Sequence, residues 1–181
     1  MNRWFLAVLC VLAVFALSSC KDVHDAVHPG TDNAPSGASP ARAGISSSAD
    51  VVKVSSPEVT IAANSSAEAT VKLSIFPGYH VNANPATFSY LIATAVNPGK
   101  AEGITAGKPV YPVARKEKFQ FADEPLAVYE GDVQIKLPLR GGSNASKGAR
   151  SLPIEVRVQA CDNEKCYAPD TLKTTIAVNV K

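Results

Sequence analysis

Charge of one sign, aromatic side chains and helical periodicity are all scarce in this sequence of 181 residues. The net charge is +2 and aromatic residues make up 7%, so we expect no nucleic-acid partner, which would require a basic surface. No segment repeats its apolar residues with the 3.6-residue period of an amphipathic helix, which argues against a helical fold. Only one long apolar run is present, at the N-terminus. No later segment approaches the ~20 residues that a membrane-spanning helix needs.

The N-terminal apolar run has the features of an export signal. A polar start with one positive charge precedes an unbroken apolar segment over residues 4–17, which is too short to cross a bilayer. The run ends in Leu17-Ser18-Ser19-Cys20, which resembles the lipobox of bacterial lipoproteins. In that family the signal is removed and the cysteine becomes a lipidated N-terminus. We expect residues 1–19 to be a signal peptide and Cys20 a durable membrane anchor. The alternative is an ordinary secretory signal that ends in Ser-Ser-Cys by chance.

The segment after Cys20 has almost no large apolar side chains. It therefore cannot bury enough surface to offset the entropy lost on ordering. We expect residues 20–50 to comprise the lipidated cysteine and a disordered tether. His24 and His28 have the spacing of a helical metal pair, but the Pro29-Gly30 step argues against a helix. We interpret both histidines as solvated.

The residue after Cys20 bears on which membrane holds the anchor. In some bacteria an Asp at this position retains a lipoprotein in the inner membrane, and here the residue is Lys21. We expect the protein to lie in the cell envelope, on the periplasmic side of a membrane. The outer membrane is favoured where that rule applies.

From about residue 51 onward, apolar side chains alternate with polar ones in period two, which predicts half-buried strands. The clearest examples cover residues 70–75, 133–139, 152–160 and 176–180. Turn signals such as Pro77-Gly78 and Gly141-Gly142 separate them. This pattern predicts that residues 51–181 form an all-β domain, an immunoglobulin-like antiparallel sandwich. A closed barrel is the alternative that the pattern does not separate from it.

Two of the four cysteines remain for the folded domain. Cys10 leaves with the signal peptide and Cys20 carries the lipid, so Cys161 and Cys166 form the only pair. One predicted strand runs directly into Cys161 and another resumes after Asp170. The pair should therefore bracket a hairpin turn, where facing Cα atoms lie about 4.5–5.5 Å apart and suit a disulfide. An oxidising periplasm would favour that bond.

The spacing of these cysteines leaves two interpretations open. The bond is either a static staple, which would contribute about 2 kcal/mol for so short a loop, or a reversible dithiol in a polar turn that a partner's thiolate can reach. The first interpretation makes the protein a binding or assembly module with a static disulfide, and it predicts a reduction potential below about −300 mV. A weaker third idea is a soft-metal site formed by Cys161, Cys166 and His80. It lacks a fourth ligand, so we expect no metal.

Residues 156–169 carry a family resemblance. The run Val-Arg-Val-Gln-Ala-Cys-Asp-Asn-Glu-Lys-Cys-Tyr-Ala-Pro resembles the active-site hairpin of the N-terminal periplasmic domain family of the thiol:disulfide interchange protein DsbD. Residues 77–82 are similar to that family's aromatic strand beside the cysteines. Residues 116–119 and 128–131 resemble its cap loop and the strand that follows. The resemblance extends in order over nearly all of residues 51–181.

The resemblance implies a fold, an activity and roles for individual residues. That family has an immunoglobulin-like fold and passes electrons from a membrane reductase to thioredoxin-like periplasmic proteins, without a cofactor. By this resemblance Cys166 is the attacking thiolate and Cys161 the resolving cysteine. Phe119 corresponds to the cap aromatic that covers the sulfurs and retracts when a partner docks. The other residues expected to line the site are His80, Asn82 and Tyr167.

The sequence departs from the family's pattern in several respects. Its Cys-x4-Cys spacing is one residue shorter, Ala168 replaces a proline, and His80 and Asn82 stand where tyrosines are frequent. Without the resemblance, Phe119 is better explained as a core aromatic and His80 as a solvated loop residue. The chain also lacks the family's membrane conduit and thioredoxin-like C-terminal domain. We therefore expect a separate membrane protein to supply electrons. A stoichiometric carrier and an enzyme with turnover are not distinguished at this level.

Overall fold

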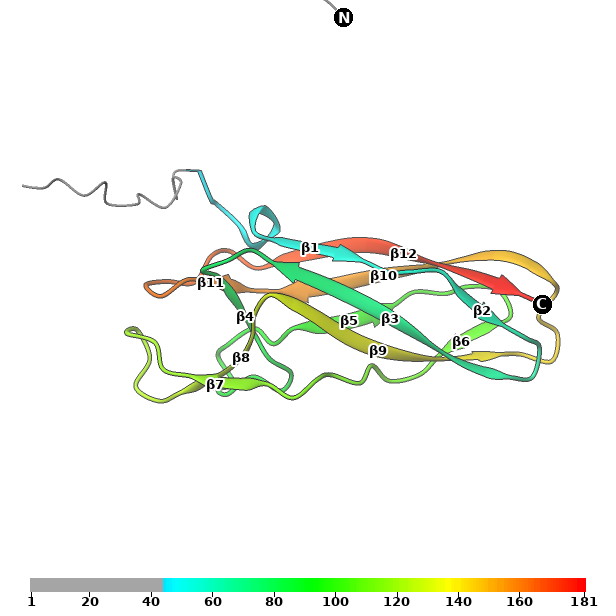
Figure 1. The fold of residues 1–181 in the computed structure, drawn as a ribbon, viewed down its shortest axis with the longest axis horizontal. Coiled ribbons are helices and arrows are strands. Elements are labelled where there is room, and N and C mark those ends of the chain that lie inside the picture. Colours follow the sequence, from blue (N-terminus) through cyan, green and yellow to red (C-terminus); the bar gives the residue numbers. More distant parts are fainter. Residues whose placement is uncertain (1–43) are drawn as a thin grey trace, which may run out of the picture. The chain divides into compact units, whose positions relative to one another are not determined.

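A computed structural model describes residues 44–181, and strands and the turns between them make up nearly all of this region (Figure 1). The predicted signal peptide, Cys20, His24 and His28 lie outside the described residues. Within residues 44–181 no helix is long and apolar enough to cross a membrane. The elements in chain order are a 3-10 turn η1 (Ser48–Asp50) and strands β1 (Val52–Ser55), β2 (Val59–Ile61), β3 (Ser66–Ile75), β4 (His80–Asn82), β5 (Ala95–Pro98), β6 (Ile104–Ala106), β7 (Arg115–Glu117), β8 (Leu126–Tyr129), β9 (Asp132–Gly141), β10 (Gly148–Val158), β11 (Ala160–Cys161) and β12 (Asp170–Val180).

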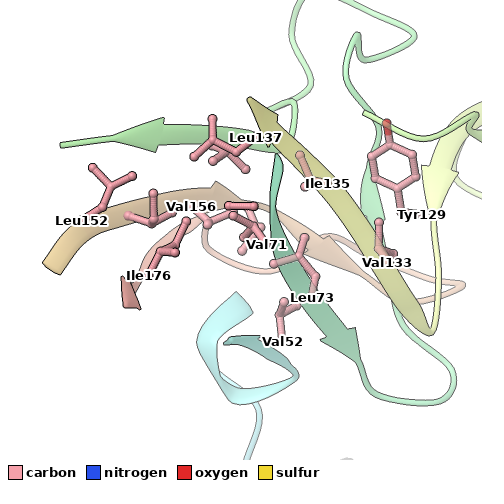
Figure 2. Close-up of a cluster of buried hydrophobic side chains, with 14 of the residues drawn as sticks. Val52, Val71, Leu73, Tyr129, Val133, Ile135, Leu137, Leu152, Val156 and Ile176 are labelled. Carbon is pink, nitrogen blue, oxygen red and sulfur yellow. The ribbon is translucent and has the colours of Figure 1, made fainter. Parts of the chain in front are cut away.

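Two four-stranded sheets enclose the main core. Their strand orders are β1-β3-β9-β6 and β2-β12-β10-β5. The alternation predicted from the sequence is confirmed, because β9 buries every second side chain and exposes the others. Side chains from both sheets meet between them, among them Val71, Ile135, Val156 and Ile176 (Figure 2). The fold is therefore all-β and immunoglobulin-like, with open sheets. One pair departs from the antiparallel prediction, since β2 runs parallel to β12.

A third sheet, of order β11-β4-β8-β7, lies at the opposite end of the domain from the C-terminus (Figure 1). It arises because the chain changes sheets between β10 and β11. β10 pairs with β12 as far as Val158 opposite Asp170, and after Gln159 the next two residues pair with β4 instead. The strand that the sequence predicts to run unbroken into Cys161 is thus divided between two sheets.

Ser48 connects the start of the described chain to the segment that carries the cysteines. Its side chain is fully buried, although the sequence analysis assigns this residue to the tether. The Ser48 hydroxyl donates to the Ala168 carbonyl at 2.7 Å and accepts from the Ala160 amide at 2.8 Å. The Ser48 amide also donates to the Ala168 carbonyl, at 3.0 Å. One residue therefore holds both flanks of the cysteine loop.

We predict that Ser48→Ala lowers the free energy of unfolding by about 1–3 kcal/mol, because the buried Ala160 amide loses its acceptor. Ser46→Ala is the matched control. Ser46 is exposed and its hydroxyl contacts only the exposed Asp50 carboxylate, so we expect a change within about 0.5 kcal/mol. Urea denaturation of both variants measures the difference. Equal effects of the two substitutions would contradict the role given to Ser48.

Candidate redox site

Cys161 and Cys166 face each other across a narrow antiparallel pair. The Asp162 amide donates to the Lys165 carbonyl at 2.9 Å and the Tyr167 amide donates to the Ala160 carbonyl at 2.8 Å. These two bonds flank the cysteines, which therefore occupy the non-hydrogen-bonded position, where strands approach most closely. The sulfurs are bonded at 2.04 Å and the Cα atoms lie 3.9 Å apart. The predicted disulfide is present in the structure, with Cα atoms closer than the 4.5–5.5 Å expected for facing residues.

The loop between the cysteines is closed by the buried carboxylate of Asp162. One oxygen, Oδ1, accepts hydrogen bonds from the amides of Glu164 at 2.8 Å and Lys165 at 2.9 Å. The other, Oδ2, accepts from the Tyr167 hydroxyl at 2.7 Å. This bond to a carboxylate, with burial adding to it, raises the pKa of Tyr167. Asp162 is not among the site residues predicted from the sequence. An Asp that begins a short polar turn is the signal that could have identified it.

In the third sheet β4 and β11 are buried on both faces and β8 nearly so, whereas β7 is mostly exposed. The cysteines lie on the outer face, which is turned away from the main core. Side chains alternate between the faces of a sheet. Val81, Ala160 and Tyr129 belong to the main core. Their neighbours in register, His80 and Cys161, must therefore point to the opposite face. That face also carries a second apolar cluster, formed by Phe119, Leu126 and Val128 with Phe88, Leu91 and Ala122 packed against it.

Phe119 lies on this outer face and stacks on His80. The two ring centroids are 3.9 Å apart with an interplanar angle of 19°, and Phe119 is only 5% exposed. Phe121, which is more exposed, extends the stack at 5.5 Å from Phe119. Lys118 helps to close this segment, because its ammonium donates to the carbonyls of Ala122 and Asp123. The structure therefore places Phe119 over the residue that pairs with Cys161. That Phe119 covers the sulfurs and retracts from them remains a prediction.

His80 is buried, with 2% of its surface exposed, so its interpretation as a solvated loop residue is wrong. It pairs with Cys161 between β4 and β11. Burial lowers the pKa of His80 to about 4, opposed in part by the charge of Asp162. Within the part of the chain that the structure describes, His80 Nε2 has no hydrogen-bond partner.

Asn82 connects β4 to the point where the chain changes sheets. It is fully buried. Its Nδ2 donates to the Ile92 carbonyl at 3.1 Å and to Gln159 Oε1 at 3.4 Å. Gln159 Nε2 in turn donates to the Tyr167 carbonyl at 3.4 Å. Asn82 and Tyr167 are both predicted site residues. Gln159, whose side-chain amide links the two, is not.

Among residues 44–181 no group of three or more His, Cys, Asp or Glu side chains could hold a metal ion. In the structure the two cysteine sulfurs are joined to each other and provide no thiolate ligand.

We predict that His80 makes the protein less stable in mild acid. Its pKa is about 4 in the folded state and about 6.5 in an unfolded chain. Its contribution to stability is therefore fully present above about pH 6.5 and is lost as the pH falls toward about 4, because only the unfolded chain takes up the proton.

The measurement is urea denaturation of the wild type and a His80→Phe variant at about pH 7 and at about pH 4.5. Between these values the stability of the wild type should decline by about 1–3 kcal/mol more than that of the variant. Both proteins lose stability through the titration of their shared carboxylates. Comparing the two losses of unfolding free energy therefore isolates the contribution of His80. Parallel losses in the two proteins would contradict the prediction.

Comparisons with known proteins place this arrangement in a family. No curated protein matches the chain. Among solved structures, the chain is similar to the Neisseria meningitidis DsbD N-terminal domain in the reduced form, with 18% identity, 65% of this chain and 82% of that chain covered, and a TM-score of 0.43. It is also similar to the N-terminal periplasmic domain of ScsB from Proteus mirabilis, with 12% identity, 71% of this chain and 45% of that chain covered, and a TM-score of 0.40.

A third solved structure, the seventh ScaB type I cohesin from Pseudobacteroides cellulosolvens, matches at 8% identity with a TM-score of 0.45, covering 72% of this chain and 92% of that one. These likenesses are too distant to carry an argument about function. The family is shown by a sequence model instead, described as thiol:disulfide interchange protein DsbD, N-terminal, which matches residues 48–177. With that match over most of its length, the chain belongs to the family of DsbD N-terminal domains.

Proposed function

We propose that this protein is a periplasmic thiol–disulfide exchange module that relays electrons through Cys161 and Cys166. Family membership and the disulfide in the structure support exchange at this pair. The finer elements of the proposal are the identity of the attacking sulfur, the partners and the lipid anchor at Cys20.

The observation that carries the proposal is the unequal burial of the two cysteines. Cys161 is fully buried, whereas Cys166 is partly exposed. Thiol–disulfide exchange needs a sulfur that a second protein can approach. The inequality therefore supports Cys166 as the sulfur that exchanges with partners and Cys161 as the resolving sulfur, in agreement with the family resemblance.

The energetics of the loop argue against a static staple. A disulfide that closes so short a loop contributes about 2 kcal/mol in the chain-entropy model. Here Asp162 already closes the same turn through three hydrogen bonds, and Ser48 holds its flanks. The turn is well determined without the covalent bond, which makes a purely structural need for it small.

A groove beside the cysteine loop offers a place where a partner could dock. The groove has a volume of about 420 Å³ and lies between Phe76 and Tyr79 on one side and the Arg115–Glu130 ion pair on the other. Phe76, which lines this groove, is 41% exposed and offers an apolar contact to a partner. We propose that thioredoxin-like periplasmic proteins and a separate membrane reductase dock here.

Lipidation at Cys20 would keep the domain at a membrane surface, where a membrane-bound electron donor can reach it. We propose the periplasmic face of the cell envelope as its location, with the outer membrane favoured by Lys21. The residues between Cys20 and Ser48 would then serve as the tether.

We predict that Cys161→Ala traps mixed disulfides with partner proteins. Without the resolving sulfur, a bond between Cys166 and a partner has no intramolecular route to break. The full-length variant, produced in the bacterium that encodes it, should give adducts on a non-reducing gel that disappear on reduction. Mass spectrometry should identify thioredoxin-like proteins among them.

Two matched variants control this experiment. Cys166→Ala keeps the buried Cys161 thiol, and we expect it to form few adducts. The double variant Cys161→Ala/Cys166→Ala has neither cysteine of the folded domain, so we expect it to form no mixed disulfides there. The proposal fails if Cys161→Ala traps no partner, or if the two single variants trap the same proteins to the same extent.

A further inference from the structure

One buried polar atom beside the disulfide has no role in the steps described so far. His80 Nε2 is enclosed, and no described residue offers it a hydrogen bond. A buried nitrogen of this kind costs free energy unless some other state of the protein satisfies it. The side chain is held in place by its stack on Phe119, so it is ordered rather than free to turn toward solvent.

The register of the third sheet places this side chain next to the buried sulfur. His80 lies opposite Cys161, and Cys161 lies opposite Cys166. The three residues therefore form one row across the sheet, on the face that Phe119 covers. Facing side chains in an antiparallel pair have Cβ atoms about 4.5–5.5 Å apart. In the disulfide form Cys161 Sγ carries no proton and has nothing to donate to the imidazole. In the dithiol form it carries an S–H.

We propose that His80 is the base that takes the proton from the Cys161 thiol when Cys161 resolves a mixed disulfide. This inference rests on the proposed exchange function and adds a residue to it. Because Cys161 is fully buried, water has little access to its proton, and an internal acceptor is the direct route.

When the protein donates electrons, the exchange takes place in two steps. The Cys166 thiolate attacks a partner disulfide, so that a bond forms between Cys166 Sγ and one partner sulfur while the other partner sulfur leaves as a thiolate. The Cys161 thiol then gives its proton to His80 Nε2, and its sulfur attacks Cys166 Sγ. The Cys161–Cys166 bond forms, and the first partner sulfur leaves as a thiolate. The imidazolium returns its proton to that thiolate or to water. Two electrons have passed to the partner.

The groups around His80 keep it ready for this step. While the disulfide is intact, burial holds the pKa of His80 at about 4, so the imidazole is neutral near pH 7 and its lone pair is free. The negative charge that develops on Cys161 Sγ as its proton leaves raises the pKa of the adjacent imidazole, which makes His80 a stronger base at the moment of transfer. The cysteine loop contributes Asp162, whose negative charge favours the imidazolium once it forms. Continuing the β4–β8 register by one residue brings Glu130 opposite His80. The Glu130 carboxylate forms an ion pair with the Arg115 guanidinium at 3.2 Å. The rings of Phe119 and Phe121 stack on the His80 side chain.

The test uses the reduced protein and dithiobis(nitrobenzoate), mixed at one reagent molecule per protein. The attack of Cys166 releases one coloured thionitrobenzoate, and resolution by Cys161 releases a second. Stopped-flow absorbance therefore separates the two steps. We compare the wild type with His80→Gln, which keeps a polar group that takes up no proton, and with His80→Phe. Tyr90→Leu is the matched control, because Tyr90 is exposed and stacks on Phe88, so the substitution removes an aromatic ring and leaves the base and its surroundings in place.

We expect the second release to be at least about tenfold slower at neutral pH in both His80 variants, with the first release little changed. In the variants the second rate should rise about tenfold per pH unit, since only hydroxide then generates the thiolate. In the wild type and in Tyr90→Leu the second rate should be nearly independent of pH near neutrality. The pH dependence of the second release rate in the wild type tests the proposal even if the His80 variants do not fold.

Equal second rates and equal pH slopes in the wild type and the His80 variants would overturn the assignment, and so would a wild-type slope of about tenfold per pH unit. Failure of the underlying function has a different signature. If the reduced wild type shows no first release, exchange at Cys166 itself is refuted, and the role of His80 with it.

Discussion

β11 consists of two residues, and its pairing with β4 determines which side chains surround the disulfide. If Ala160 and Cys161 continued along β12 as β10 does, Cys161 would belong to the main sandwich. Pairing with β4 instead places His80 beside it and turns Cys161 to the face under Phe119. Cys166 then follows in the same row. The difference in exposure between the two cysteines, the stacked histidine and the position of Phe119 all depend on this short ladder.

Polar groups that are buried and mostly satisfied stabilise that ladder. Ser48 accepts from the Ala160 amide, the Gln159 side chain joins Asn82 to the Tyr167 carbonyl, and Asp162 orders the turn. Each of these groups bonds to backbone or to another side chain near the cysteine loop. Such a network specifies a single geometry, because a displaced loop would leave several buried polar groups without partners. An active pair of cysteines benefits from that rigidity, since breaking the disulfide then leaves the loop in position.

The half-buried strands were predictable from the sequence, because each long strand has one buried and one exposed face and period-two alternation reports that contrast in β3, β9 and the ends of β10 and β12. Alternation alone did not separate a sandwich from a barrel, since both bury one face of each strand. The change of sheet at Gln159 was not predictable in the same way. Val158 and Ala160 both face the main core, so the alternation continues across the break and does not show that the partner strand has changed. The family resemblance supplied the roles of Phe119 and the cysteines, which alternation alone left open.

The burial of β4 shows why its environment was misjudged. The sequence His80-Val81-Asn82 alternates polar and apolar residues, which predicts one solvated face. All three residues are buried, because the main core covers one face and the segment that contains Phe119 covers the other. A cover that comes from elsewhere in the chain leaves no periodic signal in β4 itself. The same cover lowers the pKa of His80 and gives the site its chemical character.

The central claim is that the Cys161–Cys166 bond is reversible, and its reduction potential tests this most directly. Equilibration of the protein with thiol–disulfide buffers of known potential, with the free thiols counted after alkylation, gives the value. The account predicts a potential above about −300 mV, in the range of proteins that exchange disulfides. A potential below about −300 mV is typical of a structural disulfide and would contradict it.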